Sequence, residues 1–243
     1  MKNIAVLFEN DRCIVLNKPA GLAVQGGEGV GVSLDSLLAA EYSPRPLLVH
    51  RLDRDTSGVI LVAKNKEAAA LFSGIFARRD KVPGNDNRRG AEDTEEEKME
   101  GGVQKQYLAV CAGRPVPEAG IIETELEVRG AARKAAQRAV TFYKCLSAGE
   151  FSLLGLELGT GRMHQIRRHL ASIGHPILGD DKYGDFPLNK RLRRDRGLRR
   201  LLLHSSRLVI PEELCGFALD VSAPLPEYFG TFLEALQSTE QSV

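Results

Sequence analysis

The sequence lacks any hydrophobic run long enough to cross a bilayer. Its longest apolar stretches, such as 4–8 and 58–63, fall far short of the roughly 20 residues that a membrane helix needs. The five apolar residues that precede Glu9 are also too few for the core of a secretory signal. We therefore expect a protein with no membrane partner and a cytoplasmic location.

Cysteine is scarce, and its spacing does not suit a metal site. The four cysteines form no CxxC pair and have no nearby histidine at zinc-ligand spacing. We therefore interpret them as reduced packing residues: Cys13, Cys111, Cys145 and Cys215.

The composition excludes a disordered tail and a fibrous repeat, because 43% of the residues are hydrophobic and 27% are charged. A chain of 243 residues is long enough to bury a substantial core. We expect one folded domain over residues 1–243, acting as a monomer.

The net charge of +1 conceals two oppositely charged segments. Residues 82–102 are rich in acidic residues, Gly and Asn and have almost no large apolar side chain, so we predict a disordered acidic loop there. Residues 190–207 are strongly basic and predict a local positive field.

Apolar periodicity predicts a mainly antiparallel sheet with flanking helices. Residues 4–8 and 13–16 are typical of a strand hairpin, and Asn65 is placed to cap a helix over 66–79. A second helix is predicted over 163–173, with His164, Arg167 and Arg168 on one face.

Two segments stand out for chemistry. The 50–58 loop carries Asp53, and Gly159 to Arg167 leads into the helix that carries Arg167. An arginine beside an aspartate keeps that carboxylate ionised and directed, which suits a nucleophile or a base. Taken singly, the first segment is better explained as a solvated turn and the second as an ordinary helix start. Tyr107 lies on a predicted strand, where stacking on a nucleobase and half-burial in a sheet are both open.

Six motifs, in this order along the chain, resemble those of the RluA-type RNA pseudouridine synthases. They are Asn17-Lys18-Pro19-Ala20-Gly21, His50-Arg51-Leu52-Asp53 with Thr56-Ser57-Gly58, Lys105-x-Tyr107-Leu108-Ala109, Gly161-Arg162-x-His164-Gln165-Ile166-Arg167-x-His169, Gly174-His175-Pro176-Ile177, and Leu203-His204. Asp180-Asp181-x-Tyr183-Gly184-Asp185 is most similar to the branch that modifies large-subunit ribosomal RNA.

The resemblance implies an α+β pseudouridine synthase fold, with a mixed, mainly antiparallel sheet flanked by helices and an active-site cleft across the sheet. It implies an isomerase that needs no cofactor and no metal. Many relatives carry an additional RNA-binding domain in front, which we do not expect here because 16 residues precede Asn17.

The resemblance also implies roles for individual residues. Asp53 matches the catalytic aspartate, whose role is open among attack on the ribose, addition to the base and proton abstraction from the sugar. Arg167 matches the arginine that pairs with it, and Tyr107 the tyrosine that contacts the flipped base. Arg51 matches a residue that fills the gap left by the extruded nucleotide.

RNA is the expected partner, and the basic residues are the candidates to bind it. Phosphate contacts of this kind weaken steeply with salt. The candidate RNA-binding residues are Arg51, Arg162, His164, Arg168, Lys190, Arg191, Arg193 and Arg194. Met163 stands where the family usually has Thr, and we expect activity to survive that change.

Three other interpretations stay open from the sequence. One is a transfer RNA pseudouridine synthase of the same family, and another is an RNA-binding protein without catalysis. The third is a metal-dependent hydrolase, for which the candidate ligands are His50, Asp53, Asp55, His164, His169 and His204. The five-residue spacing of His164 and His169 argues against the hydrolase, because it turns the two rings off a common helix face.

Overall fold

The computed structural model describes residues 4–27, 29–79, 102–127 and 136–240. The predicted acidic loop over 82–102 therefore lies almost entirely outside the described residues. In the described part of the chain no helix is long and apolar enough to cross a membrane.

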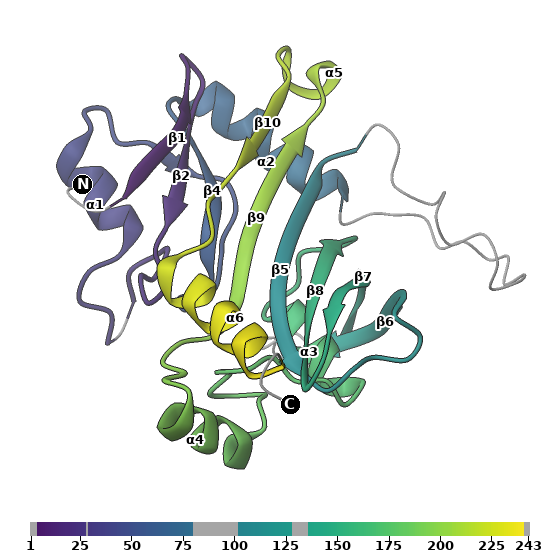
Figure 1. The fold of residues 1–243 in the computed structure, drawn as a ribbon. Coiled ribbons are helices and arrows are strands. Elements are labelled where there is room, and N and C mark those ends of the chain that lie inside the picture. The colour runs from purple at the N-terminus through teal and green to yellow at the C-terminus, as the bar shows by residue number, and fades with distance from the viewer. Residues whose placement is uncertain (1–3, 28, 80–101, 128–135, 241–243) are drawn as a thin grey trace, which may run out of the picture.

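A single extended sheet runs through the molecule, as predicted (Figure 1). Its main path has the order β1-β2-β4-β9-β5-β8-β7-β6, with β3 paired to β4 and β10 to β9. The strands are β1 (Ala5–Glu9), β2 (Cys13–Lys18), β3 (Leu47–Leu48), β4 (Ser57–Ala63), β5 (Gln104–Ala112), β6 (Ala119–Glu127), β7 (Ala136–Ala148), β8 (Phe151–Leu158), β9 (Leu203–Ile210) and β10 (Leu219–Ser222).

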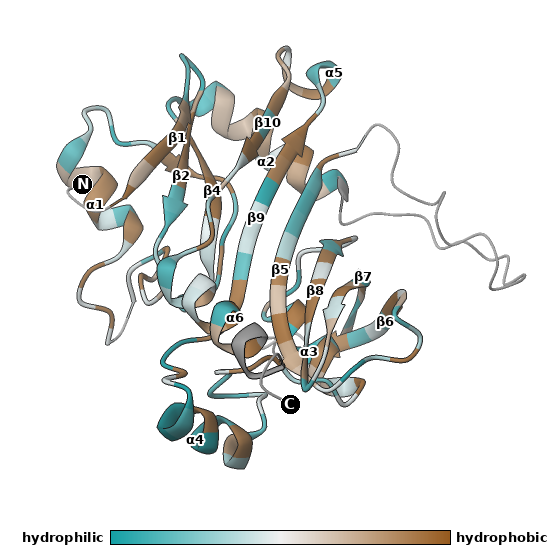
Figure 2. Ribbon diagram, in the orientation of Figure 1, coloured by the Kyte–Doolittle hydropathy of each residue, from teal (hydrophilic) through white to brown (hydrophobic). Residues whose placement is uncertain are grey.

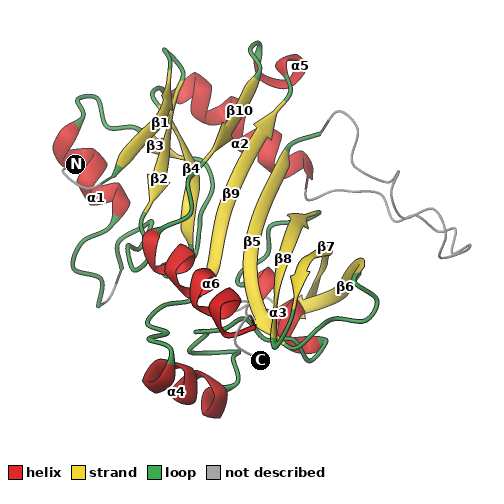
Figure 3. Cartoon of the chain, in the orientation of Figure 1, coloured by secondary structure: helices red, strands yellow, loops and turns green. Residues whose placement is uncertain are grey.

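Within the described ranges, six helices lie at the sides and ends of this sheet (Figure 3). Asn65 caps the second of them, as predicted, by accepting a hydrogen bond from the Ala68 N–H at 2.8 Å. The helices are α1 (Leu34–Glu41), α2 (Lys66–Arg79), α3 (Gln165–Ser172), α4 (Phe186–Asp195), α5 (Glu212–Cys215) and α6 (Glu227–Glu240).

The core lies on both faces of the sheet, because side chains alternate along each strand. In β2, Ile14 and Leu16 join the cluster that contains α1 and α3, whereas Cys13 and Val15 join the cluster that packs on α2. A third cluster joins α4 and α6 to β5 and β8. In Figure 2 these strands carry both brown and teal stretches, and α4 has both hydrophilic and hydrophobic turns.

The one parallel pairing among the described strands brings β4 and β9 unusually close. Gly58 has a φ of +108°, and a Cβ atom there would lie 2.0 Å from the carbonyl oxygen of Ser205. A side chain is therefore excluded, and glycine supplies the backbone conformation that other residues rarely adopt. This close approach fixes the start of β4, which is the end of the loop that carries Asp53.

Candidate active site

Asp53 lies on the loop between β3 and β4, at the wall of a pocket of about 750 Å³. The loop is held by its backbone, since the Thr56 N–H donates to the Asp53 carbonyl at 3.2 Å. Lys18 Nζ and the Gly21 N–H both donate to the Arg54 carbonyl at 2.9 Å. The turn after β2 therefore clamps the residue next to Asp53.

Lys18 is fully buried beneath this loop. Its ammonium also donates to the carbonyls of Pro19 and Leu22, at 3.0 and 2.9 Å, so three acceptors surround it. Burial lowers the pKa of Lys18 to about 7, and the nearby Asp55 and Asp53 carboxylates oppose that shift only in part.

Arg167, on α3, lies next to Asp53 as predicted. Its Nη1 is 3.6 Å from Asp53 Oδ2, and its side chain is 5% exposed against 23% for Asp53. A buried guanidinium beside a partly exposed carboxylate stabilises the ionised acid while leaving it open to the pocket.

Asp180 and Asp181 hold Arg167 more tightly than Asp53 does, and sequence reasoning gave neither residue a role. Asp180 accepts from Arg167 Nε and Nη2, each at 2.7 Å, and Asp181 accepts from Nη2 at 3.2 Å. Such a two-point pair fixes the plane of the guanidinium. The available signal was the Asp180-Asp181 doublet in a motif assigned only to a branch of the family.

The electrostatics of Asp180 fit this fixing role. Burial raises the pKa of Asp180, but hydrogen bonds from Arg167 and from the backbone N–H groups of Tyr183 and Lys182 outweigh burial and lower it overall. The carboxylate is therefore ionised near neutral pH and is a permanent anchor for Arg167.

The predicted shared face of His164, Arg167 and Arg168 was wrong for Arg168. The helix begins at Gln165, so His164 precedes it, and adjacent residues on a helix point about 100° apart. Arg168 donates to the carbonyl of Glu127 at 3.3 Å instead of lining the pocket. His164 does line it, with Nε2 3.8 Å from Asp53 Oδ1.

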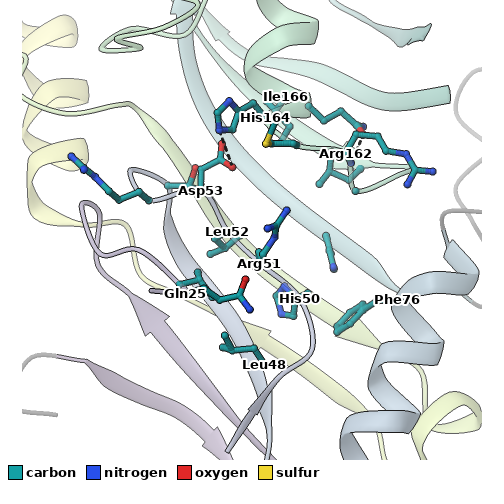
Figure 4. Close-up of a pocket in the computed structure, with 18 of the residues that line it drawn as sticks. Gln25, Leu48, His50, Arg51, Leu52, Asp53, Phe76, Arg162, His164 and Ile166 are labelled. Atoms are coloured by element: carbon teal, nitrogen blue, oxygen red, sulfur yellow. Dashed lines mark hydrogen bonds and ion pairs between the residues drawn. The ribbon is translucent and has the colours of Figure 1, made fainter. Parts of the chain in front are cut away.

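The remaining predicted pocket residues surround the same space (Figure 4). Arg51 lies on the Asp53 loop, Arg162 precedes α3 and donates to the Arg138 carbonyl at 3.3 Å, and Tyr107 lies on β5 and is 7% exposed. With Lys105 also in the lining, cationic side chains outnumber carboxylates, which suits a polyanionic ligand.

Residues 190–195 of the basic segment lie on α4, and this helix is outside the pocket lining. Arg191 and Arg196 pair with Glu150 at 3.4 and 2.9 Å, and Arg194 pairs with Asp195 at 2.6 Å. These acids reduce the positive field that the sequence predicted. Glu150 was not part of that prediction, because it lies far away in the sequence, in the turn between β7 and β8. Among the described residues, Lys190 and Arg193 have no acidic partner within 4 Å.

The histidines that a metal-dependent hydrolase would need are engaged elsewhere. His169 is buried between the hydroxyls of Thr124 and Thr141, at 3.0 and 2.9 Å. His204 is buried on β9, with Nδ1 2.9 Å from Ser57 Oγ. In the part of the chain that the structure describes, no three His, Cys, Asp or Glu side chains gather as a metal site would require.

Comparison with known proteins relates this chain to one enzyme family. The family model described as RNA pseudouridylate synthase matches residues 12–172. A ribosomal large subunit pseudouridine synthase C of Rickettsia bellii is 33% identical over 92% of this chain and 69% of its own length. A tRNA pseudouridine synthase C of Haemophilus ducreyi is 36% identical over 84% of this chain and 83% of its own length.

A solved structure agrees as well. The human protein named RNA pseudouridylate synthase domain containing 4 superposes with a TM-score of 0.72 at 27% identity, covering 96% of this chain and 93% of that one. The family model spans both Asp53 and Arg167. The chain therefore belongs to the RNA pseudouridylate synthase family.

Proposed function

We propose that Asp53 supplies the catalytic carboxylate with which this enzyme converts uridine in RNA to pseudouridine. The observation that carries the proposal is the approach of Asp53 Oδ2 to Arg167 Nη1, at 3.6 Å, at the wall of a pocket large enough for a nucleotide. That distance exceeds hydrogen-bond length, so the guanidinium stabilises the charge on the carboxylate without occupying its lone pairs in a tight bond.

The reaction is an isomerisation that balances within the nucleotide. The N1–C1′ bond breaks, the base turns, and a C5–C1′ bond forms. C5 loses a proton and N1 gains one. No electron is gained or lost overall, so the chemistry required is charge stabilisation and proton transfer, which carboxylate, guanidinium and phenol groups supply.

We assign two other pocket residues the roles that the family resemblance implies, and both residues line the pocket. Tyr107, on the β5 wall, contacts the flipped base. Arg51, on the Asp53 loop, occupies the space that the base leaves in the RNA. Extruding a nucleotide costs a few kcal/mol of stacking, and a side chain that fills the gap offsets part of that cost.

The substrate that we assign is large-subunit ribosomal RNA. The Rickettsia relative carries that substrate in its name and is 33% identical over 92% of this chain. Transfer RNA is the second candidate, because the Haemophilus relative named for it is 36% identical and is covered over more of its own length, 83%.

Mapping pseudouridine in cellular RNA tests both assignments. Cells without this protein are compared with the same cells supplied with wild-type protein or with Asp53→Asn. We expect sites in large-subunit ribosomal RNA to disappear without the protein and to return only with wild type. Loss of sites in transfer RNA alone favours the second substrate, and an unchanged map contradicts the proposed function.

A further inference from the structure

His164 has a strained backbone at the edge of the pocket. Its φ is 54°, and it is the one non-glycine residue in the described ranges with a positive φ. It occupies the N-cap position of α3, yet its side chain makes no capping hydrogen bond. Strain of this kind persists where the surrounding structure enforces it, and it concentrates at functional sites.

The ring of His164 lies between two polar groups. Nδ1 is 3.1 Å from the Tyr183 hydroxyl, and Nε2 is 3.8 Å from Asp53 Oδ1. An ionised Asp53 accepts hydrogen bonds but donates none. A neutral His164 ring can therefore donate to Asp53 only if its proton is on Nε2. Nδ1 is then the acceptor for the Tyr183 O–H, and one arrangement satisfies both neighbours.

Tyr183 is itself held by the residue that holds Arg167. Its N–H donates to Asp180 Oδ1 at 2.9 Å, and its ring centroid lies 5.3 Å from the Arg167 guanidinium carbon. Asp180 therefore fixes Arg167 directly and His164 through Tyr183. These two side chains approach opposite oxygens of Asp53, Oδ2 and Oδ1.

We propose that His164 is a positioning residue for Asp53, which presents a neutral Nε2–H to Oδ1 while Tyr183 fixes its tautomer. The inference rests on the proposed role of Asp53. Burial lowers the pKa of His164, despite the opposing effect of Asp53, which agrees with a neutral ring. Nε2 and Oδ1 are 3.8 Å apart, and hydrogen bonds between catalytic groups are often long before substrate binds and tighten in the complex with substrate.

Three variants test the proposal. His164→Asn removes the ring with a residue that tolerates the left-handed conformation. Tyr183→Phe removes only the hydroxyl that sets the tautomer. Tyr143→Phe is the matched control, because the Tyr143 hydroxyl donates to the Pro117 carbonyl at 3.1 Å on another part of the molecule. Activity is followed as tritium release from large-subunit ribosomal RNA transcribed with 5-tritiated uridine.

We expect His164→Asn to lower the single-turnover rate about 10- to 100-fold, the usual effect of losing a hydrogen bond to a charged group. RNA affinity should stay within about twofold of wild type, since the side chain acts on Asp53 and not on phosphate. Tyr183→Phe should lower the rate by less, and Tyr143→Phe should leave it unchanged.

Nitrogen-15 NMR of the imidazole provides a readout that a merely structural role would not move. Wild type should show His164 protonated on Nε2, and Tyr183→Phe should shift the population toward the Nδ1 tautomer. Protonation on Nδ1 in wild type overturns the proposal. A loss of RNA affinity in His164→Asn at an unchanged bound-state rate also overturns it and makes His164 an RNA-binding residue.

The variant Asp53→Asn separates the two claims. If it loses turnover while His164→Asn and Tyr183→Phe keep wild-type rates, the inference fails and the proposed function stands. If Asp53→Asn keeps the wild-type rate, the proposed function fails first.

Discussion

Arginine–aspartate pairs occur in two very different settings in this molecule. On α3, Arg167 is 5% exposed and Asp180 1% exposed, and the two join through a pair of hydrogen bonds. On α4, Arg194 and Asp195 are 76% and 43% exposed. The same residue types therefore orient a side chain in one region and supply only a surface field in the other.

The two pairs differ in how far water reaches them. Water screens an exposed pair, which contributes about 0–1 kcal/mol to stability. Removing one partner of a buried pair instead leaves a charge that water cannot reach, at a cost of about 3–5 kcal/mol. A buried pair can therefore aim a catalytic group, and a surface cluster suits the long-range attraction of RNA.

The largest effect on stability is expected for Asp180→Asn, which removes the anchor of Arg167. The free energy of unfolding should fall by about 3 kcal/mol, measured by urea denaturation, and turnover should fall with it. The control is Asp195→Asn on α4, which should leave the unfolding midpoint unchanged. Equal losses of unfolding free energy in the two variants would contradict a difference between the buried and the exposed pair.

Lowering the pH should also reveal the contribution of the buried Asp180 to stability. The pKa of Asp180 is lowered on folding, so the stability it contributes is present above its ordinary value and is lost as pH falls through its folded value. Below pH about 4, wild type should lose stability more steeply than Asp180→Asn. Parallel curves for the two proteins would contradict an ionised, buried Asp180.

A smaller effect is expected on α4, where Lys190 and Arg193 are the candidates to bind phosphate. Changing both to Gln should weaken RNA binding without changing turnover of bound RNA. The slope of log affinity against log salt should decrease by about 0.7–0.9 for each phosphate that is no longer neutralised. An unchanged slope would show that α4 does not touch the RNA backbone.

The smallest effect is expected for Met163→Thr. Met163 is 37% exposed at the pocket edge, and its neighbours His164 and Arg167 are held by other residues. Turnover should stay within about twofold of wild type, the usual range for an exposed substitution. A change of tenfold or more would mean that a hydroxyl at this position takes part in the reaction.

Short sequence patterns predicted the elements that are formed by residues close together in the chain. Two apolar runs on either side of a polar turn located the β1–β2 hairpin, and Asn65 gave the start of α2 because a cap joins near neighbours in the chain. Helix α1 went unpredicted, since its capping box pairs Ser33 with Ser36 in place of the usual Glu or Gln.

At the site, the pairing of Asp53 with Arg167 was predicted and is confirmed by the 3.6 Å separation of their charged groups. The anchoring by Asp180 was not predictable from spacing. Thirteen residues separate it from Arg167, and α3 and the turn after it must fold back before the two meet. Arg168 was misplaced because it directly follows Arg167, and adjacent residues on a helix point about 100° apart, so of the three predicted residues only His164 and Arg167 approach Asp53.

The central claim is that one carboxylate, Asp53, carries the isomerisation, and single-turnover tritium release by Asp53→Asn tests it most directly. The matched control is Asp35→Asn, which removes a carboxylate that pairs with Arg45 at 3.6 Å on α1. With equal RNA affinity in all three proteins, we predict release by wild type and Asp35→Asn and none by Asp53→Asn. Release by Asp53→Asn at the wild-type rate would contradict the account.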